Sequence, residues 1–110
     1  MKWTHLESHE QLDQIKQKQG YTLIFKHSTR CSISMMAKRR FELDWGAFPD
    51  DIPLYFLDLI RYRDISNQVA HLFQVHHESP QLLLIKDGEC ILDQSHGGIS
   101  VEEAIGEIGN

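Results

Sequence analysis

Two nearly continuous apolar runs stand out in the pattern of hydrophobic and polar positions along this chain. They cover residues 21–26 and 54–59 and are rich in leucine, β-branched and aromatic side chains. Short apolar runs of this composition are typical of strands that are buried on both faces of a sheet. Helical patterns follow each run, so the order predicts parallel strands joined by a helical crossover.

Turn and helix-start signals divide the rest of the chain into further elements. Ser8 and Gln11 have the spacing of a capping box, as do Ser100 and Glu103. Asp87-Gly88 has the pattern of a two-residue hairpin turn. The expected elements are a strand at 3–5, a helix from Ser8 to Gly20, a strand at 21–26, a helix from Ser32 to about Leu43, a strand at 54–59, a helix capped by Asp64 or Ser66, a hairpin of 81–86 and 89–94, and a helix at 101–108.

This order predicts an α/β fold with a central mixed sheet of about four to five strands flanked by helices. The chain has 110 residues and is expected to form one domain, residues 1–110. In the second expected helix, Ile33, Met36, Ala37 and Phe41 recur at three- and four-residue spacing. We therefore expect these four side chains to face the core.

The composition argues against several classes of function. The formal charge is −5 and no basic-aromatic stripe is present, so binding to nucleic acid is not expected. No apolar run approaches the ~20 residues that cross a membrane, and the start of the chain lacks a secretory pattern. We expect a cytoplasmic protein. The basic cluster Lys38-Arg39-Arg40 is either a solvated helix face or a means of attracting an anionic ligand.

Cys31 is the candidate reactive group. Ser28-Thr29 follows the first buried strand and can cap the helix whose first turn holds Cys31. Unpaired backbone N–H groups and the helix dipole favour a thiolate at such a position. The alternative interpretation is an unreactive small residue at a helix start.

Cys90 and the histidines are the other residues that could carry chemistry. Cys90 could pair with Cys31, but cytosolic thiols are usually reduced, and Cys90 is expected to be a structural residue of the late strand. The seven histidines and two cysteines match no compact ligand spacing, so no metal site is expected. Met35 and Met36 are interpreted as packing residues.

The layout resembles the thioredoxin fold, in which a reactive cysteine begins the helix after a central strand and a cis-proline precedes the hairpin. Cys31 and Pro80 occupy these two places. We predict a cis Ser79–Pro80 bond, because X–Pro bonds are only modestly biased towards trans. The alternative is a proline that merely starts a strand where no ladder donor is needed.

The chain also resembles the monothiol bacilliredoxin family over nearly its full length. The blocks that carry this resemblance are FKHSTRCSIS at 25–34 and HHESPQ at 76–81, with Ser95-His96 as weaker support. Family members typically have Pro-Ile-Ser after the cysteine, whereas this chain has Ser32-Ile33-Ser34. It therefore lacks the proline that would pre-set the first helical turn.

The resemblance implies thiol–disulfide exchange that removes bacillithiol from mixed disulfides on cytosolic proteins. Bacillithiol would be a thiol co-substrate rather than a permanently bound cofactor, and the partners would be bacillithiolated proteins. Cys31 is the implied nucleophile, and Ser34 is placed to donate a hydrogen bond to its thiolate. Because Ser34 stands where a second cysteine would resolve the mixed disulfide, resolution needs an outside thiol or Cys90.

Four residues are assigned to substrate binding. Thr29 belongs to the cysteine block, and Arg30 is either a partner for the malyl carboxylates of bacillithiol or an exposed arginine that serves solubility. The backbone of Ser79, before Pro80, is expected to pair with an extended substrate segment. His27 is either a proton-transfer group or a structural residue at a strand end.

A different class of function remains open beside the exchange reaction. The chain could be a thioredoxin-like binding module with an unreactive Cys31 and a partner surface around Pro80. A Cys31 thiol whose pKa lies at or above the free value of about 8.5 would favour this second function.

Overall fold

A computed structural model describes residues 3–28 and 32–108 of the chain. In this part, five strands form one sheet in the order β1-β3-β2-β4-β5. The elements are β1 (Thr4–His5), α1 (His9–Gln17), β2 (Tyr21–His27), α2 (Ser32–Asp44), the 3-10 helix η1 (Trp45–Ala47), β3 (Leu54–Asp58), α3 (Arg63–Leu72), β4 (Gln81–Lys86), β5 (Glu89–Ser95), the 3-10 helix η2 (His96–Gly98) and α4 (Val101–Glu107).

Strand β2 lies at the centre of the sheet. It pairs in parallel with β3 on one side and antiparallel with β4 on the other. Phe25, in the middle of β2, lies opposite Phe56 of β3 and Leu82 of β4, and all three side chains are buried. The prediction of two buried strands joined by a crossover, in a mixed sheet of an α/β fold, is therefore confirmed.

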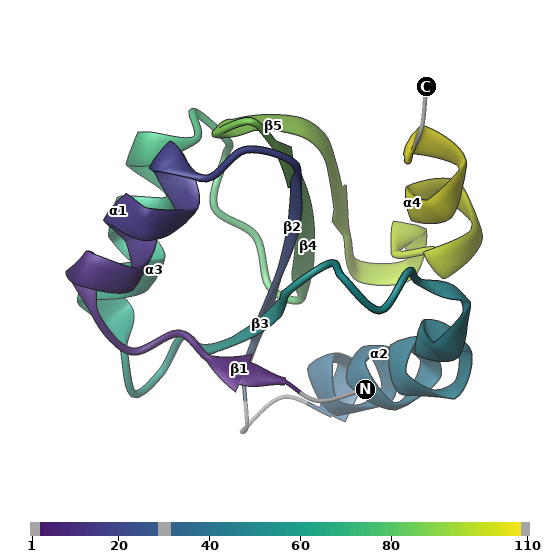
Figure 1. Cartoon of the computed structure of the whole chain (residues 1–110). Coiled ribbons are helices and arrows are strands. Elements are labelled where there is room, and N and C mark those ends of the chain that lie inside the picture. Colours follow the sequence, from purple (N-terminus) through teal and green to yellow (C-terminus); the bar gives the residue numbers. More distant parts are fainter. Residues whose placement is uncertain (1–2, 29–31, 109–110) are drawn as a thin grey trace.

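The helices cover both faces of the sheet. Figure 1 shows α1 and α3 on one side and α2 and α4 on the other. Alternate residues of β2 serve the two sides, as the two-residue period of a strand requires: Phe25 packs with Phe41 of α2, and Ile24 packs with Val69 of α3. The end of β2 can therefore present different side chains to the two layers.

Local sequence signals located several element ends correctly. The Ser8–Gln11 capping box is present at the start of α1. At Ser100, the side chain accepts a hydrogen bond from the Glu103 N–H, but the Glu103 carboxylate accepts one from Gln94 Nε2 instead of completing a box.

The hairpin turn between β4 and β5 is also as expected. Asp87 and Gly88 have φ of 53° and 81°. These positive values are those of a type I′ turn. A Cβ at Gly88 would collide with the carbonyl oxygen of Lys16, so this position requires glycine.

The expected cap of α3 was wrong. The helix begins at Arg63, its N-cap is Tyr62 without a side-chain hydrogen bond, and Asp64 and Ser66 lie inside it. Asp58 at the end of β3 organises the preceding turn instead. Its side chain accepts a hydrogen bond from the Ile60 N–H, and its carbonyl accepts one from the Tyr62 N–H.

The inward face of α2 also differs from the expectation. Ala37 and Phe41 are buried as expected, but Ile33 is 61% exposed and Met36 is 70% exposed. Ser34 completes the buried face. A helix turns by about 100° per residue. Because Ser34, Ala37 and Phe41 face the sheet, Ile33 and Met36, each one residue before a buried position, point away from it. Met35, expected to pack, is 54% exposed.

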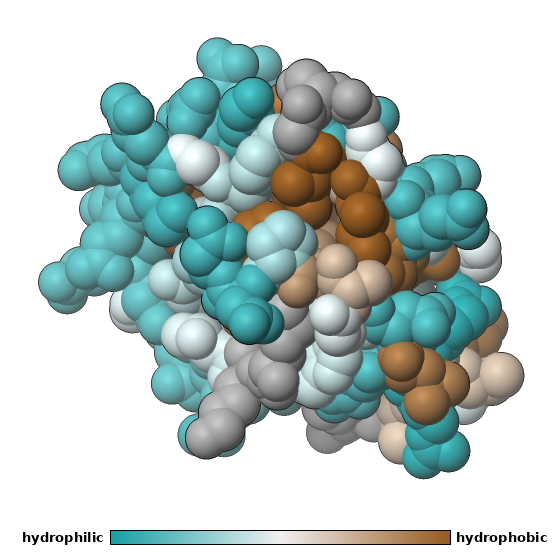
Figure 2. All heavy atoms as spheres, turned by 45° about the vertical axis from the view of Figure 1, so that its right-hand side comes forward, coloured by the Kyte–Doolittle hydropathy of each residue, from teal (hydrophilic) through white to brown (hydrophobic). Residues whose placement is uncertain are grey.

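Helix α2 therefore carries most of the exposed apolar side chains in the described residues. The large hydrophobic residues that are exposed are Ile33, Met35, Met36, Leu43 and Ile91. On the face shown in Figure 2, most of the surface is hydrophilic and the hydrophobic residues gather in a hollowed area near the middle and a smaller group at the lower right. Within residues 3–28 and 32–108, no helix is long and apolar enough to span a membrane.

Candidate functional site

The start of α2 and the segment before β4 meet at the carboxyl end of the central strand β2. His27 ends β2 and Ser32 begins α2, while Lys26 pairs with Gln81, the residue after Pro80. Cys31, Thr29 and Arg30, which the sequence analysis assigned to this site, lie outside the described residues. Their flanking residues Ser28 and Ser32 are described.

Ser34 connects the end of β2 to α2. Its hydroxyl oxygen lies 2.7 Å from His27 Nδ1 and accepts a 3.0 Å hydrogen bond from the Ser28 N–H. Ser34 is completely buried and His27 is 4% exposed. The structure therefore gives Ser34 two partners that the sequence analysis did not foresee, and its contact with the Cys31 thiolate stays a prediction.

The state of His27 decides what the Ser34 proton can do. Burial lowers the pKa of His27, the positive charge of Lys38 lowers it further, and the contact with Ser34 opposes the shift. A neutral imidazole carries one ring proton. With that proton on Nδ1, Ser34 Oγ accepts from both Ser28 and His27, and its own proton is free for a third partner. With the proton on Nε2, Ser34 donates to Nδ1 instead.

The predicted cis peptide bond is confirmed: Ser79–Pro80 is cis. The Pro80 carbonyl accepts a 3.0 Å hydrogen bond from the His96 N–H, which joins this segment to the end of β5. The Ser79 hydroxyl is buried and has no hydrogen-bond partner among the described residues. The use of Ser79 and Pro80 in substrate binding stays a prediction.

A buried lysine lies on the opposite face of β2 from His27. Lys26 is 0% exposed, and burial lowers its pKa from 10.5 to about 8. Its Nζ lies 3.2 Å from His77 Nδ1, and Ser66 Oγ lies 3.4 Å from the same nitrogen. Sequence reasoning missed this contact. The available signals were a lysine at the end of an apolar run and the paired histidines before Pro80.

Cys90 lies far from this end of β2. It pairs with Ile85 of β4, which in turn pairs with Thr22 at the other end of β2. Thr22 is five residues before His27, which corresponds to about 16 Å along a strand. Burial, together with Asp93, raises the pKa of the half-buried Cys90 thiol to about 11. These properties support the structural interpretation of Cys90.

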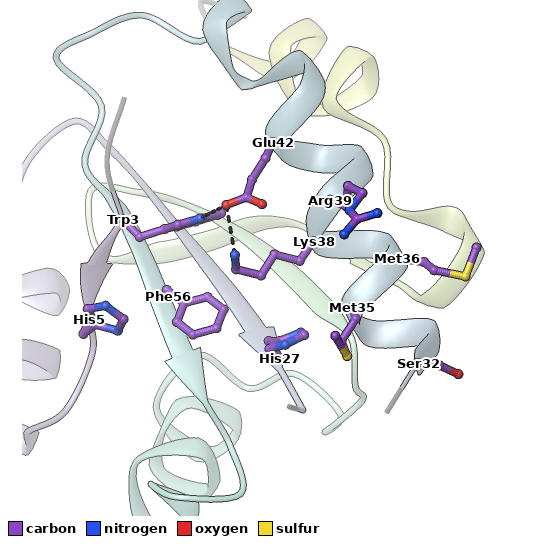
Figure 3. A pocket seen from close by; sticks show the side chains of 10 residues that line it. All are labelled: Trp3, His5, His27, Ser32, Met35, Met36, Lys38, Arg39, Glu42 and Phe56. Atoms are coloured by element: carbon purple, nitrogen blue, oxygen red, sulfur yellow. Dashed lines mark hydrogen bonds and ion pairs between the residues drawn. The ribbon is translucent and has the colours of Figure 1, made fainter. Parts of the chain in front are cut away.

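A cavity of about 720 Å³ opens beside Ser32, between α2 and the β1/β3 edge (Figure 3). Its lining residues are Trp3, His5, His27, Ser32, Met35, Met36, Lys38, Arg39, Glu42 and Phe56. No local pattern in the sequence indicates this cavity, because its lining comes from the β1 segment, β2, α2 and β3. In the described residues, no three His, Cys, Asp or Glu side chains are grouped so as to hold a metal ion.

Solved structures with the same architecture define the class of protein. A protein described as a proposed oxidoreductase with a thioredoxin fold is 31% identical with a TM-score of 0.81, over 93% of this chain and 89% of that one. Oxidised mitochondrial thioredoxin 3 from Saccharomyces cerevisiae is 19% identical with a TM-score of 0.77, over 96% and 95%. A structure from work on the thiol resolving mechanism of yeast mitochondrial 1-Cys peroxiredoxin is 20% identical with a TM-score of 0.78, over 96% and 95%. This chain is a thioredoxin-fold protein.

The family is narrower than the fold. The model of the monothiol bacilliredoxin BrxC family matches residues 4–104, and the chain belongs to this family. Together with the thioredoxin-fold oxidoreductase relative, this membership supports a thiol–disulfide redox function.

Proposed function

We propose that the protein removes bacillithiol from mixed disulfides on cytosolic proteins through the single thiol of Cys31. The observation that carries this proposal is the family match over residues 4–104, combined with a serine three positions after the cysteine. In the first step, the Cys31 thiolate attacks the bacillithiol sulfur of the mixed disulfide. The protein substrate leaves as a thiolate and takes up a proton, and bacillithiol becomes disulfide-bonded to Cys31.

The second step requires a thiol from outside the chain. Ser34 cannot resolve the disulfide, and Cys90 lies at the far end of the sheet with a thiol whose pKa is raised to about 11. A second bacillithiol would attack the adduct on Cys31. This step releases bacillithiol disulfide and regenerates the Cys31 thiol, so the two steps together consume one free bacillithiol thiol and restore one protein thiol.

Roles for the surrounding residues follow from this sequence of steps. Ser34 would donate a hydrogen bond to the Cys31 thiolate while its oxygen accepts hydrogen bonds from the Ser28 N–H and from His27. Thr29, Arg30 and the Ser79–Pro80 segment would bind substrate. Bacillithiol acts as a co-substrate, with no permanently bound cofactor, and the protein works in the cytoplasm.

Intact-mass measurement tests the proposal directly. The purified protein is mixed with bacillithiol disulfide, alongside the Cys31→Ala and Cys90→Ala variants. One bacillithiol adduct is expected on the wild type and on Cys90→Ala, and none on Cys31→Ala. An adduct that disappears only in Cys90→Ala would overturn the assignment of the nucleophile.

A thioredoxin-like binding module is the second candidate function. The exposed side chains of Ile33, Met35 and Met36 lie next to Ser32 and favour contact with a partner. An unreactive Cys31, with a thiol pKa at or above about 8.5, would support this function over exchange. The pH dependence of Cys31 alkylation distinguishes the two.

A further inference from the structure

We propose that the cavity between α2 and the β1/β3 edge binds the carboxylate-bearing part of the low-molecular-weight thiol, with Arg39 as its anion-binding residue. This inference rests on the proposed function and assigns the thiol a binding site on the protein. The site differs from the Ser79–Pro80 segment, where an extended protein substrate is expected to bind.

The position of the cavity suits a small molecule that is attached through its sulfur. Ser32, the residue after Cys31, lines one end, and Glu42 of the same helix lines the other. The ten residue steps from Ser32 to Glu42 span about 15 Å along the helix. A volume of about 720 Å³ is within the range that holds small organic ligands.

The far end of the cavity is bridged. Trp3 Nε1 donates a 2.8 Å hydrogen bond to Glu42 Oε2, which links the segment before β1 to α2 (Figure 3). An extended peptide that entered from Ser32 would meet this bridge. A compact ligand fits within the closed length.

The floor of the cavity is aromatic. The rings of Trp3 and Phe56 lie 5.8 Å apart, and the His27 ring lies 5.3 Å from Phe56. Met35 adds an apolar side wall that points into the cavity in Figure 3. Such a surface accepts the C–H face of a sugar ring, while the charged groups of a ligand need partners at the rim.

The charges of the rim favour an anion. Lys38 Nζ donates a 2.9 Å hydrogen bond to Glu42 Oε2. Burial raises the pKa of the Glu42 carboxyl, but the hydrogen bonds from Lys38 and Trp3 outweigh it, so the net pKa is lowered and Glu42 stays ionised. This pair neutralises one cation and one anion of the lining.

Arg39 is the cavity-lining cation that stands outside the Lys38–Glu42 pair. It is exposed, and it makes no ion pair with any of the described residues. A guanidinium presents paired donors that match a carboxylate in a bidentate arrangement. An arginine at the rim, without an ion pair among the described residues, together with an aromatic floor therefore favours a ligand that combines a carboxylate with an apolar or sugar-like body.

A comparison of two disulfides tests this inference. Bacillithiol disulfide carries malyl carboxylates, whereas 2-hydroxyethyl disulfide is uncharged. The rate constant for reaction of each with Cys31 is measured for the wild type and for Arg39→Glu and Arg40→Glu. Arg40 is the matched control, because it is the adjacent exposed arginine of α2 and lies outside this cavity.

The expected result is specific to one variant and one disulfide. Arg39→Glu should slow the reaction with bacillithiol disulfide by about tenfold or more, because the variant loses the charge-assisted contact with the carboxylate and adds a repelling charge, and it should leave 2-hydroxyethyl disulfide unchanged. Arg40→Glu should change either rate by less than about twofold, as expected for a solvated charge.

Four outcomes would overturn the inference. Equal effects of the two variants would mean that only the general charge of α2 matters. An effect of Arg39→Glu on bacillithiolated proteins but not on bacillithiol disulfide would show that the cavity receives the protein substrate instead. If the wild type reacts with both disulfides and Arg39→Glu does not slow the reaction with bacillithiol disulfide, this site is removed but the exchange function stays intact. A wild type that reacts with neither disulfide would overturn the proposed function and this inference together.

Discussion

The Ser34 hydroxyl lies 2.7 Å from His27 Nδ1, which joins α2 to the end of the central strand through two buried side chains. This contact occupies the position at which a dithiol oxidoreductase has its second cysteine. A serine there cannot resolve the mixed disulfide within the chain, because it has no thiol. Its hydroxyl is oriented instead by the neighbouring neutral imidazole.

Replacement of Ser34 by alanine tests both roles of this hydroxyl. Ser34→Ala leaves the Ser28 N–H and His27 Nδ1 without their partner, and we expect a loss of roughly 1–3 kcal/mol in the free energy of unfolding. Because we propose that Ser34 donates a hydrogen bond to the Cys31 thiolate, its replacement should raise the pKa of that thiol by roughly one. Chemical denaturation and the pH dependence of iodoacetamide labelling measure the two effects.

Ser32→Ala is the matched control for that variant, since Ser32 begins the same helix but is exposed. It should change stability and thiol pKa only slightly. If Ser34→Ala destabilises the protein but leaves the thiol pKa unchanged, the hydroxyl has a structural role alone.

Introduction of a cysteine at the Ser34 position should convert the reaction to a dithiol mechanism. In Ser34→Cys, the new thiol can attack the adduct on Cys31 and release free bacillithiol with an intramolecular disulfide. Mass spectrometry after reaction with bacillithiol disulfide should then show loss of two hydrogens in place of the adduct. A persistent adduct would mean that the position 34 side chain does not reach the Cys31 sulfur.

Lys26 predicts an unusual dependence of stability on pH. Its pKa falls from 10.5 to about 8 in the folded protein. Between these values the unfolded chain holds a proton that the folded chain has lost, so the free energy of unfolding should rise with pH across this window. The gain for this one group is at most roughly 3 kcal/mol.

The comparison for Lys26 uses denaturation of the wild type and Lys26→Met at pH 7.5 and pH 10. The rise between the two conditions should be smaller in Lys26→Met, whereas Lys18→Met, which removes an exposed lysine, should behave like the wild type. An identical pH response in all three proteins would contradict the lowered pKa of Lys26.

Cys90 should be inert in the folded protein. With a thiol pKa of about 11, roughly one molecule in a thousand carries the thiolate at pH 8. Iodoacetamide at that pH should label a single thiol in the native protein and a second one only after unfolding, as counted by intact mass. Rapid native labelling in Cys31→Ala would show instead that Cys90 is accessible and reactive.

Much of the fold could be predicted from local patterns. The apolar runs that became β2 and β3, the hairpin turn at Asp87-Gly88 and the Ser8 cap depend on short stretches whose chemistry allows few alternatives. The cis bond before Pro80 follows from the resemblance of the layout to the thioredoxin fold and from the modest trans bias of X–Pro bonds, and the structure confirms it.

The spacing of apolar residues could not predict which face of α2 is buried. Ile33 and Met36 fit the same three- and four-residue spacing as Ser34 and Phe41. The two faces differ by the rotation of one residue, and only packing against Phe25 and Phe48 decides between them. Ser34 is buried where an isoleucine was expected, because its hydroxyl has His27 as a hydrogen-bond partner.

The amino-acid sequence by itself determined the order of the elements, the single cysteine near the end of the central strand and the serine three positions after it. Only the tertiary structure decided which side chains meet there. It placed His27 against Ser34, Lys26 against His77, Trp3 against Glu42, and Phe56 beneath Lys38. The physical reason is that strand, turn and cap preferences act between residues close in sequence, whereas burial, pKa shifts and cavities depend on groups that folding brings together from distant positions.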